Sequence, residues 1–261
     1  MLSYQHHYHA GNLADLHKHA LLAWVLEYLT GKQKPLSYIE THAGRGLYDL
    51  DAPEARKTGE AAAGILRGES ALPEDHPYRR AIAATRAAHG PMAYPGSPLI
   101  AAHLLRATDS ITLAELHPGE YAHLARVMAG SGAKLYHRDG LELARALCPP
   151  TPRRGVVMID PSYEVKDDYT ALPRLLADLR RKWNVGVLLL WYPILTSDLH
   201  APMTARLQTD HPDIALHETC FALIRAGHRM VGSGLAVINP PWGMDAEAAR
   251  LDQVIRGISG G

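Results

Sequence analysis

The residues Asp160-Pro161-Ser162-Tyr163 directly follow the apolar run Gly155-Val156-Val157-Met158-Ile159. The run is typical of a buried strand, and because proline cannot continue the hydrogen-bonded ladder, the tetrapeptide is expected in the loop at the strand's carboxyl end. The Asp160 carboxylate and the Pro161 carbonyl can accept both N–H bonds of an exocyclic amine, while Tyr163 can stack on the ring that carries it. For the tetrapeptide alone, a structural Asp-Pro turn with Tyr163 in the core is the favoured interpretation, so its surroundings must decide.

Three other predicted strands also end in an acid: Leu36–Glu40, Ser110–Glu115 and Ala133–Gly140, which contains Asp139. Because the carboxyl ends of parallel strands meet at one crevice, we expect these acids to converge on Asp160. Such a set suits S-adenosylmethionine: Glu115 for the ribose diol, Asp139 for the adenine amine, and Asp160 facing the methyl group. The four acids therefore predict an S-adenosylmethionine site.

A glycine loop follows the first of these strands, in Glu40-Thr41-His42-Ala43-Gly44-Arg45-Gly46. An acid followed by GxG is typical of a nucleotide-binding first loop, where glycine lets the backbone approach the ligand. The loop lacks the third glycine of the dinucleotide fingerprint and a Gly-Lys-Ser/Thr sequence, so neither NAD nor a P-loop is favoured. The backbone near Gly44 and Gly46 suits the aminoacyl end of S-adenosylmethionine.

A second amine-binding pattern, Asn239-Pro240-Pro241-Trp242, follows the apolar residues Leu235–Ile238 and is closer in composition to such motifs than Asp160-Pro161-Ser162-Tyr163. It comes after the last predicted strand, however, whereas Asp160 closes the strand that is next in sequence after the other acids. We therefore expect Asp160 to be functional and Asn239 structural.

The remaining pattern predicts an α/β fold with a Rossmann-like sheet and helices on both faces. Helices are expected over Leu13–Leu29 and Leu99–Arg106, the latter preceded by Ser97 as a cap or a ligand contact, and a central strand over Val185–Trp191. Residues 47–95, rich in Ala, Arg, Glu and Pro, are predicted to be a helical insertion. The expected organisation is an N-terminal part at residues 1–46, the insertion at 47–95, and the rest of the domain at 96–261.

Composition limits the function classes. Lys and Arg (27) balance Asp and Glu (27), which argues against non-specific coating of nucleic acid. No membrane span or signal peptide is indicated, so a cytoplasmic protein is expected. The two cysteines, Cys148 and Cys220, are far apart and are expected to be core thiols. Five of the sixteen histidines lie in the first nineteen residues, but without metal-ligand spacing, so no metal site is predicted.

Taken together, the motifs resemble the class I S-adenosylmethionine-dependent amino methyltransferases, and more closely the RlmJ family, over nearly the whole chain. The motifs that carry the resemblance are Leu2-Ser3-Tyr4, His9-Ala10-Gly11-Asn12, Lys18-His19, Thr41-His42-Ala43-Gly44, Tyr94-Pro95-Gly96-Ser97-Pro98, Glu115-Leu116-His117-Pro118, Asp139-Gly140, Asp160-Pro161, Trp191-Tyr192-Pro193 and Ile238-Asn239-Pro240-Pro241-Trp242. Two features depart from the family: Ser162 replaces the usual second proline, and the chain ends soon after Asp245, which leaves the completion of the sheet's edge open.

The resemblance implies methylation of the N6 amine of a specific adenine in 23S ribosomal RNA, before ribosome assembly is complete, by a monomeric enzyme. It implies that S-adenosylmethionine contacts His19, His42, Ser97, Glu115, Asp139, Gly140 and Asp160. Asp160 would also be the catalytic residue. The RNA would be met by Tyr4, His6, Lys18 and Tyr163, although a solvated surface lysine is the other interpretation of Lys18.

Three alternatives are retained. A DNA adenine-N6 methyltransferase shares the same catalytic logic, although no separate target-recognition domain is evident. A non-catalytic RNA-binding protein could keep the fold, but the intact set of four acids argues against it. A histidine-dependent metalloprotein would have to bind metal stoichiometrically.

Overall fold

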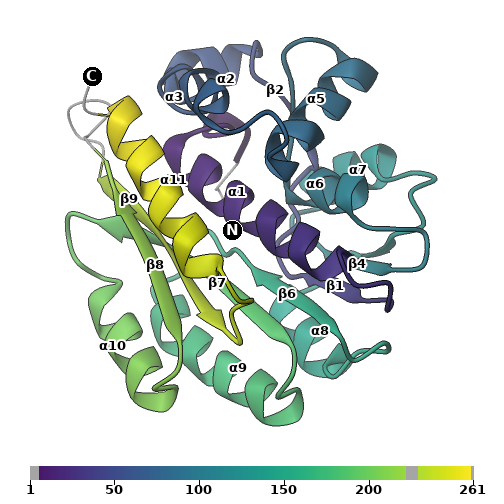
Figure 1. Ribbon diagram of the computed structural model, residues 1–261, viewed down its shortest axis with the longest axis vertical. Helices are drawn as coiled ribbons and strands as arrows, with labels where there is room; N and C mark the ends of the chain where they lie inside the picture. The colour runs from purple at the N-terminus through teal and green to yellow at the C-terminus, as the bar shows by residue number, and fades with distance from the viewer. Residues whose placement is uncertain (1–5, 222–228, 260–261) are drawn as a thin grey trace.

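The computed structural model describes residues 6–221 and 229–259, which form a seven-stranded sheet with helices on both faces (Figure 1). In spatial order its strands are β5 (Lys134–Tyr136), β4 (Ser110–Ala114), β1 (Ser37–Glu40), β6 (Gly155–Ile159), β7 (Val187–Leu195), β9 (Met230–Ile238) and β8 (Ala215–Cys220). The first five are parallel, whereas β9 runs antiparallel to both β7 and β8. The order reverses beside β1, which pairs with β4 and β6, and open α/β sheets bind ligands at such a point. The predicted Rossmann-like sheet is confirmed.

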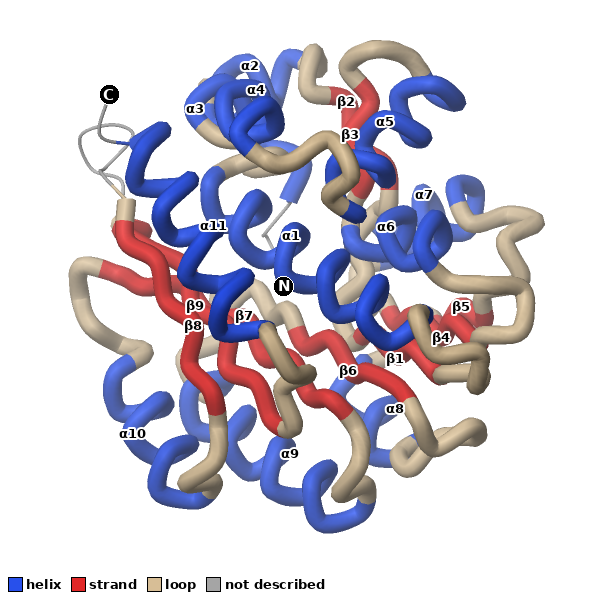
Figure 2. Tube along the Cα trace, viewed as in Figure 1, coloured by secondary structure: helices blue, strands red, loops and turns tan. Residues whose placement is uncertain are grey.

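Two layers of helices enclose the sheet, as Figure 2 shows. One layer contains α1 (Leu13–Thr30), α6 (Ser97–Leu104), α7 (Pro118–Val127) and α11 (Met244–Ser259), and the other contains α8 (Gly140–Leu147), α9 (Asp168–Lys182) and α10 (Ala201–Asp210). Helix α6 begins two residues earlier than expected, so Ser97 lies in its first turn and Gly96 takes the cap position without a side-chain hydrogen bond. Ser97 is therefore available to another partner.

Strand β6 is buried on both faces, as its uninterrupted apolar sequence predicts. Val156 and Met158 pack on the α1 side of the sheet, while Val157 and Ile159 pack on the α9 side, and all four are fully buried. The alternation follows from the two-residue period of a strand. Hydrogen bonding to β1 and β7 on either side fixes where β6 ends, and therefore where Asp160 lies.

Residues 47–95 contain the expected short helices: α2 (Pro53–Thr58), α3 (Glu60–Ala63), α4 (Ile65–Gly68), the 3-10 helix η2 (Glu69–Ala71) and α5 (Pro77–His89). The two ends of this segment pair with each other as a small antiparallel sheet of β2 (Leu47–Asp49) and β3 (Ala93–Pro95), which was not predicted. Three-residue strands are too short to show a repeat in sequence. Their pairing brings both ends of the segment back to the main sheet.

The edge of the main sheet is completed by β8, which precedes β9 in the chain and also escaped prediction. After β9, the chain forms α11, which packs against α1 and closes that face (Figure 1). Cys148 is buried as expected, but the expectation for Cys220 is wrong, because it lies exposed at the end of the edge strand. No helix within the described residues is both long and apolar enough to cross a membrane.

Candidate active site

A cavity of about 530 Å³ lies at the carboxyl ends of β1, β4, β6 and β7. Its wall contains all seven residues predicted to bind S-adenosylmethionine, namely His19, His42, Ser97, Glu115, Asp139, Gly140 and Asp160. His6, Lys18 and Tyr163, predicted to meet RNA, line it too. Tyr4 lies outside the described residues. Residues far apart in sequence are thus brought to one cavity, whose volume is typical of a small-molecule site.

Asp160 is held by a lysine from α1. The Lys18 Nζ lies 2.6 Å from Asp160 Oδ2 and 5.1 Å from the centre of the Trp191 ring. Within the described part of the chain, Lys18 is the only hydrogen-bond donor to this carboxylate, so Oδ1 keeps its accepting capacity. The Lys18 side chain is only 5% exposed, which rules out the interpretation of a solvated surface lysine.

Asp15 provides a second carboxylate beside Lys18, and this role was not predicted from the sequence. Its Oδ1 lies 3.2 Å from Lys18 Nζ, and its Oδ2 accepts from the Gly11 backbone N–H at 2.9 Å and lies 2.9 Å from His6 Nε2. Burial alone would raise the pKa of Asp15, but the charges of His6 and Lys18 lower it well below its usual value. The three-residue spacing of Asp15 and Lys18 on one helix was the available signal.

Lys18 is therefore a buried cation between two carboxylates. Burial opposes its charge, but Asp160 and Asp15 together raise the pKa of Lys18 above its usual value. Helix α1 can hold this group rigidly because Asn12 caps it, accepting a hydrogen bond from Asp15 N at 2.8 Å. The cap and the ionic pair share Asp15, so the start of α1 and the site are built together.

Glu115 faces the glycine loop. The Gly44 N–H donates to its Oε2 at 2.8 Å, and the His117 N–H donates to its Oε1 at 2.7 Å. Burial raises the pKa of Glu115, although both backbone donors oppose that shift. Gly44 has a φ of 60°, and a Cβ there would come within 2.7 Å of the Tyr48 hydroxyl, so the loop needs glycine both for its backbone and for space. Glu115 is thus fixed with each oxygen still able to accept another bond.

Asp139 and Gly140 form the start of α8. Asp139 Oδ1 accepts from the N–H groups of Leu141 and Glu142 at 2.8 and 2.9 Å, so this acid caps the helix as well as lining the cavity. A Cβ at Gly140 would lie 1.8 Å from the Thr41 carbonyl oxygen. The glycine therefore lets α8 begin directly against the end of β1, and its place in the motif has a packing reason.

Glu40 does not line the cavity, so the prediction that four acids converge there is wrong for this one. Its side chain is fully buried and receives hydrogen bonds from the Ser97 hydroxyl and, at 3.0 Å, the Tyr38 hydroxyl. Burial raises the pKa of Glu40 to about 8 against the effect of these two donors. Glu40 holds Ser97, which lines the cavity, without lining the cavity itself. The position of an acid at the end of a strand does not distinguish these two roles.

Two of the histidines that line the cavity, His19 and His42, are held as neutral groups. Burial lowers the pKa of His19 to about 3, and its Nδ1 lies 3.1 Å from the Tyr94 hydroxyl. Burial also lowers the pKa of His42, whose Nδ1 lies 2.7 Å from the Thr41 hydroxyl. At neutral pH both rings can donate or accept one hydrogen bond without bringing a charge.

Tyr163 and Trp191 form an aromatic wall beside Asp160. The Tyr163 hydroxyl donates to the Trp191 carbonyl at 2.8 Å, and the rings meet edge to face with centroids 6.1 Å apart. Tyr163 has a φ of 55°, which is rare for a bulky residue and marks a loop whose shape is imposed by its surroundings. The indole nitrogen of Trp191 donates to Ser233 on β9 at 2.9 Å, which fixes the second ring.

The second amine-binding pattern lies elsewhere. Because β9 is antiparallel to β7, Asn239 follows β9 at the opposite end of the sheet, where its amide donates to the carbonyls of Asn184 and Gly186 at 3.0 and 2.8 Å. The expectation that Asn239 is structural is confirmed. Its side chain ties the end of β9 to the turn that leads into β7.

The arrangement offers, beside one another, a carboxylate with a free acceptor, two aromatic rings, neutral histidines and backbone groups of a glycine loop. No group of three potential metal ligands occurs among residues 6–221 and 229–259. The glycine-lined approach and the acceptors of Glu115 and Asp139 suit a polar ligand with hydroxyl and amine donors, such as a nucleoside. The site can therefore place such a ligand against a second, amino-bearing ring near Asp160.

The chain is similar in sequence to known ribosomal RNA methyltransferases. A family model described as "Ribosomal RNA large subunit methyltransferase D, RlmJ" matches residues 33–257. A protein of Escherichia coli K12 named "Ribosomal RNA large subunit methyltransferase J" is 38% identical over 252 residues, which cover 95% of this chain and 90% of that protein. A protein of the same name from Haemophilus influenzae is 37% identical over 257 residues, which cover 96% of this chain and 92% of that protein. The crystal structure of a Legionella pneumophila protein superposes with a TM-score of 0.86 at 33% identity, covering 95% of this chain and 92% of that one.

Proposed function

We propose that this chain, which belongs to the RlmJ family of large-subunit ribosomal RNA methyltransferases, methylates the exocyclic N6 amine of a specific adenine in 23S ribosomal RNA with S-adenosylmethionine as methyl donor. The observation that carries the proposal is the Asp160 carboxylate beside two aromatic rings: Lys18 holds one of its oxygens, and the other accepts no hydrogen bond from residues 6–221 and 229–259. The predictions of a monomer, of a cytoplasmic location and of action before ribosome assembly is complete remain part of this proposal.

The residues of the cavity fit S-adenosylmethionine. Glu115 would accept from the ribose hydroxyls, Asp139 and the start of α8 would meet the adenine, and the Gly44 loop would take the aminoacyl end, with His19, His42, Ser97 and Gly140 completing the wall. When bound, S-adenosylmethionine supplies an electrophilic methyl group.

The chain's own contribution at the reacting centre is to orient the target amine. The N6 lone pair is delocalised into the adenine ring, so the free amine is a poor nucleophile. Acceptance of its two N–H bonds by Asp160 Oδ1 and the Pro161 carbonyl would localise the lone pair and aim it. Lys18 holds the carboxylate in position through Oδ2. Positive charge that develops on the amine would face Asp160, which can then accept the departing proton.

The target base must leave its stack to enter the cavity. Tyr163 and Trp191 offer rings against which it can pack, and base–aromatic stacking contributes about 1–3 kcal/mol per base. His6, fixed by Asp15, and Lys18 lie at the same end of the cavity and would meet the RNA there, together with Tyr4. Ser162 stands where the family usually has a second proline, so this chain has a backbone N–H at that position that proline lacks. Ser162 also lines the cavity.

The test is Asp160→Asn, assayed by transfer of a tritiated methyl group to protein-free 23S ribosomal RNA, with nucleoside analysis for N6-methyladenosine. Asparagine keeps the shape but replaces one acceptor oxygen with an amide and removes the charge, so the rate is expected to fall by at least about 100-fold. Asp75→Asn, an exposed position in a loop, is the matched control and should retain the wild-type rate. Far-UV circular dichroism and the midpoint of urea unfolding show that each variant is folded.

Two results would contradict the proposal. If Asp160→Asn transfers the methyl group at the rate of the Asp75→Asn control, Asp160 is not a catalytic residue. Wild-type transfer to duplex DNA in preference to the RNA would favour the DNA adenine-N6 methyltransferase instead.

A further inference from the structure

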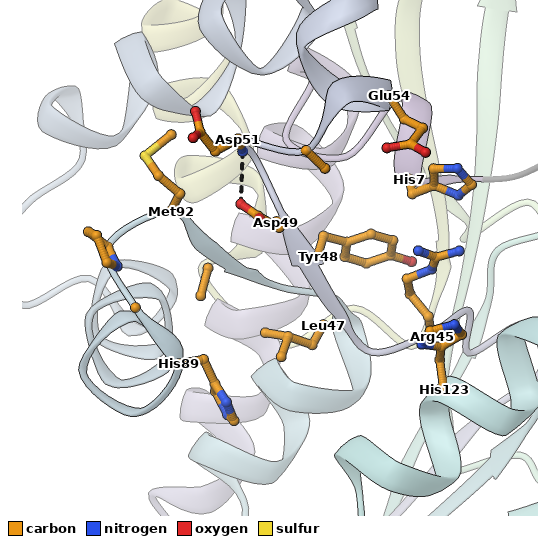
Figure 3. Close-up of a pocket in the computed structure, with 14 residues that line it drawn as sticks. His7, Arg45, Leu47, Tyr48, Asp49, Asp51, Glu54, His89, Met92 and His123 are labelled. Carbon is orange, nitrogen blue, oxygen red and sulfur yellow. Dashed lines mark hydrogen bonds between the residues drawn. The ribbon is translucent and has the colours of Figure 1, made fainter.

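Figure 3 shows a second cavity, whose volume is about 700 Å³. Tyr48 lines both cavities. His6 lines the first and His7 the second, and the Arg45 guanidinium on the second wall makes two hydrogen bonds, at 2.9 and 2.7 Å, to the Glu120 carboxylate on the first. The two cavities are therefore neighbours, with Tyr48 in the wall of both.

The second cavity is built by the segment proposed as an insertion. Strands β2 and β3 provide Leu47, Asp49 and Ala93, and the loops beside them provide Met92 and Asp51. Figure 3 shows the Tyr48 ring and Leu47 along one wall, with Arg45 and His7 at one end. Its lining thus combines an apolar surface and flat rings with polar side chains, as in sites that hold an unstacked base.

The charges of this lining favour a neutral ligand with N–H donors. Three carboxylates, from Asp49, Asp51 and Glu54, face the cavity against a single arginine that Glu120 already neutralises. Arg56 pairs with Asp51, and Asp49 Oδ1 accepts the Asp51 backbone N–H at 2.9 Å. Asp49 Oδ2 and the Glu54 carboxylate are the acceptors that a ligand can use. Burial and the charge of Arg45 lower the pKa of His7, and the same two causes lower that of His123, so neither ring adds positive charge at neutral pH. Such a lining repels phosphate and accepts hydrogen bonds from amines.

An adenosine that enters the first cavity is covalently joined to a nucleotide on each side, so at least one neighbouring base must lie close to the mouth. We propose that the second cavity binds the base of a nucleotide adjacent to the target adenosine and prefers adenine, cytosine or guanine to uracil. The inference rests on the proposed function and adds a determinant of substrate choice to it. Uracil has no exocyclic amine, and its N3–H donor is flanked by two carbonyl oxygens, which the carboxylates of Asp49 and Glu54 would face unfavourably.

The test uses a single-stranded RNA oligonucleotide that contains the target adenosine, with each of the four bases, and an abasic site, placed in turn at the position before and the position after it. At one of the two positions, the KM of the wild type is expected to be on the order of 10-fold higher for uridine than for the amino-bearing bases, with kcat little changed. The abasic site should raise KM by about 5- to 150-fold, because base stacking is lost.

Asp49→Asn should abolish most of the preference, because the amide can donate to a uracil carbonyl as well as accept. Asp75→Asn, in the same segment but away from the cavity, is the matched control and should keep the preference of the wild type. The affinity for S-adenosylmethionine should be the same in all three proteins.

The inference is overturned if neither neighbouring position shows a base preference, or if Asp49→Asn keeps the preference seen with Asp75→Asn. These outcomes differ from failure of the proposed function, in which no RNA, including natural 23S ribosomal RNA, accepts the methyl group.

Discussion

Replacing Lys18 with methionine should destabilise the protein more than replacing Asp160. Lys18 lies between two carboxylates, with Nζ 2.6 Å from the partly buried Asp160 and 3.2 Å from the buried Asp15, whose side chain is 1% exposed. Methionine leaves these two negative charges facing each other without their cation. Breaking a buried pair in this way costs about 3–5 kcal/mol in the free energy of unfolding.

Asp160→Asn removes one of the two carboxylates instead, and Lys18 keeps Asp15 as a counter-ion at 3.2 Å. The loss is then close to that of one charged hydrogen bond, about 1.5–3 kcal/mol at most. In the double variant the unpaired charge at position 160 is absent as well, so it should be more stable than Lys18→Met alone. The coupling between the two substitutions should therefore be favourable by at least about 1 kcal/mol.

The assay is urea unfolding followed by circular dichroism at pH 7, with the wild type, both single variants and the double variant compared. Lys166→Met, an exposed lysine in the loop before α9, is the matched control and should change stability by no more than about 0.5 kcal/mol. Two results would show that the three charges do not form an ionic group. One is a Lys18→Met protein that is as stable as this control. The other is a double variant whose loss in the free energy of unfolding equals the sum of the losses in the single variants.

Two further substitutions test the structure. Asn239→Ala should lower the free energy of unfolding by about 1–3 kcal/mol, because two backbone carbonyls lose their donor, while methyl transfer per folded molecule stays at the wild-type rate; a loss of transfer with unchanged stability would return Asn239 to the active site. For Glu40, the folded-state pKa of about 8 lies above the usual value of 4.5, so its contribution to stability is fully present below pH 4.5 and is lost as the pH rises through 8. Between pH 4.5 and 8, the free energy of unfolding of the wild type should therefore fall by up to about 1.4 kcal/mol per pH unit relative to that of Glu40→Gln. If urea unfolding gives the same pH dependence for both proteins from pH 5 to 8, the raised pKa of Glu40 is refuted.

Much of the fold could be predicted from the sequence because its signals are local. The apolar runs of β6 and β7 and the helical spacing of α1 are long enough to show a pattern, and all three elements lie within a few residues of their predicted positions. β2, β3 and β8 were missed because two are only three residues long and the third lies at the sheet's exposed edge, where burial imposes a weaker pattern.

The sequence by itself also determined which chemistry is available: a carboxylate and a proline at the end of a buried strand, with acids after neighbouring strands. Only the tertiary structure decided which of them share a space. Glu40 ends a strand as Asp160 does, yet its side chain turns into the core behind Ser97, whereas Lys18 comes from a helix distant in sequence to reach Asp160. Strand direction likewise separates Asn239 from Asp160, because the antiparallel course of β9 carries it to the far end of the sheet. Sequence encodes where a strand stops, but pairing partners and packing set where its last side chain points, and those depend on residues far away in the chain.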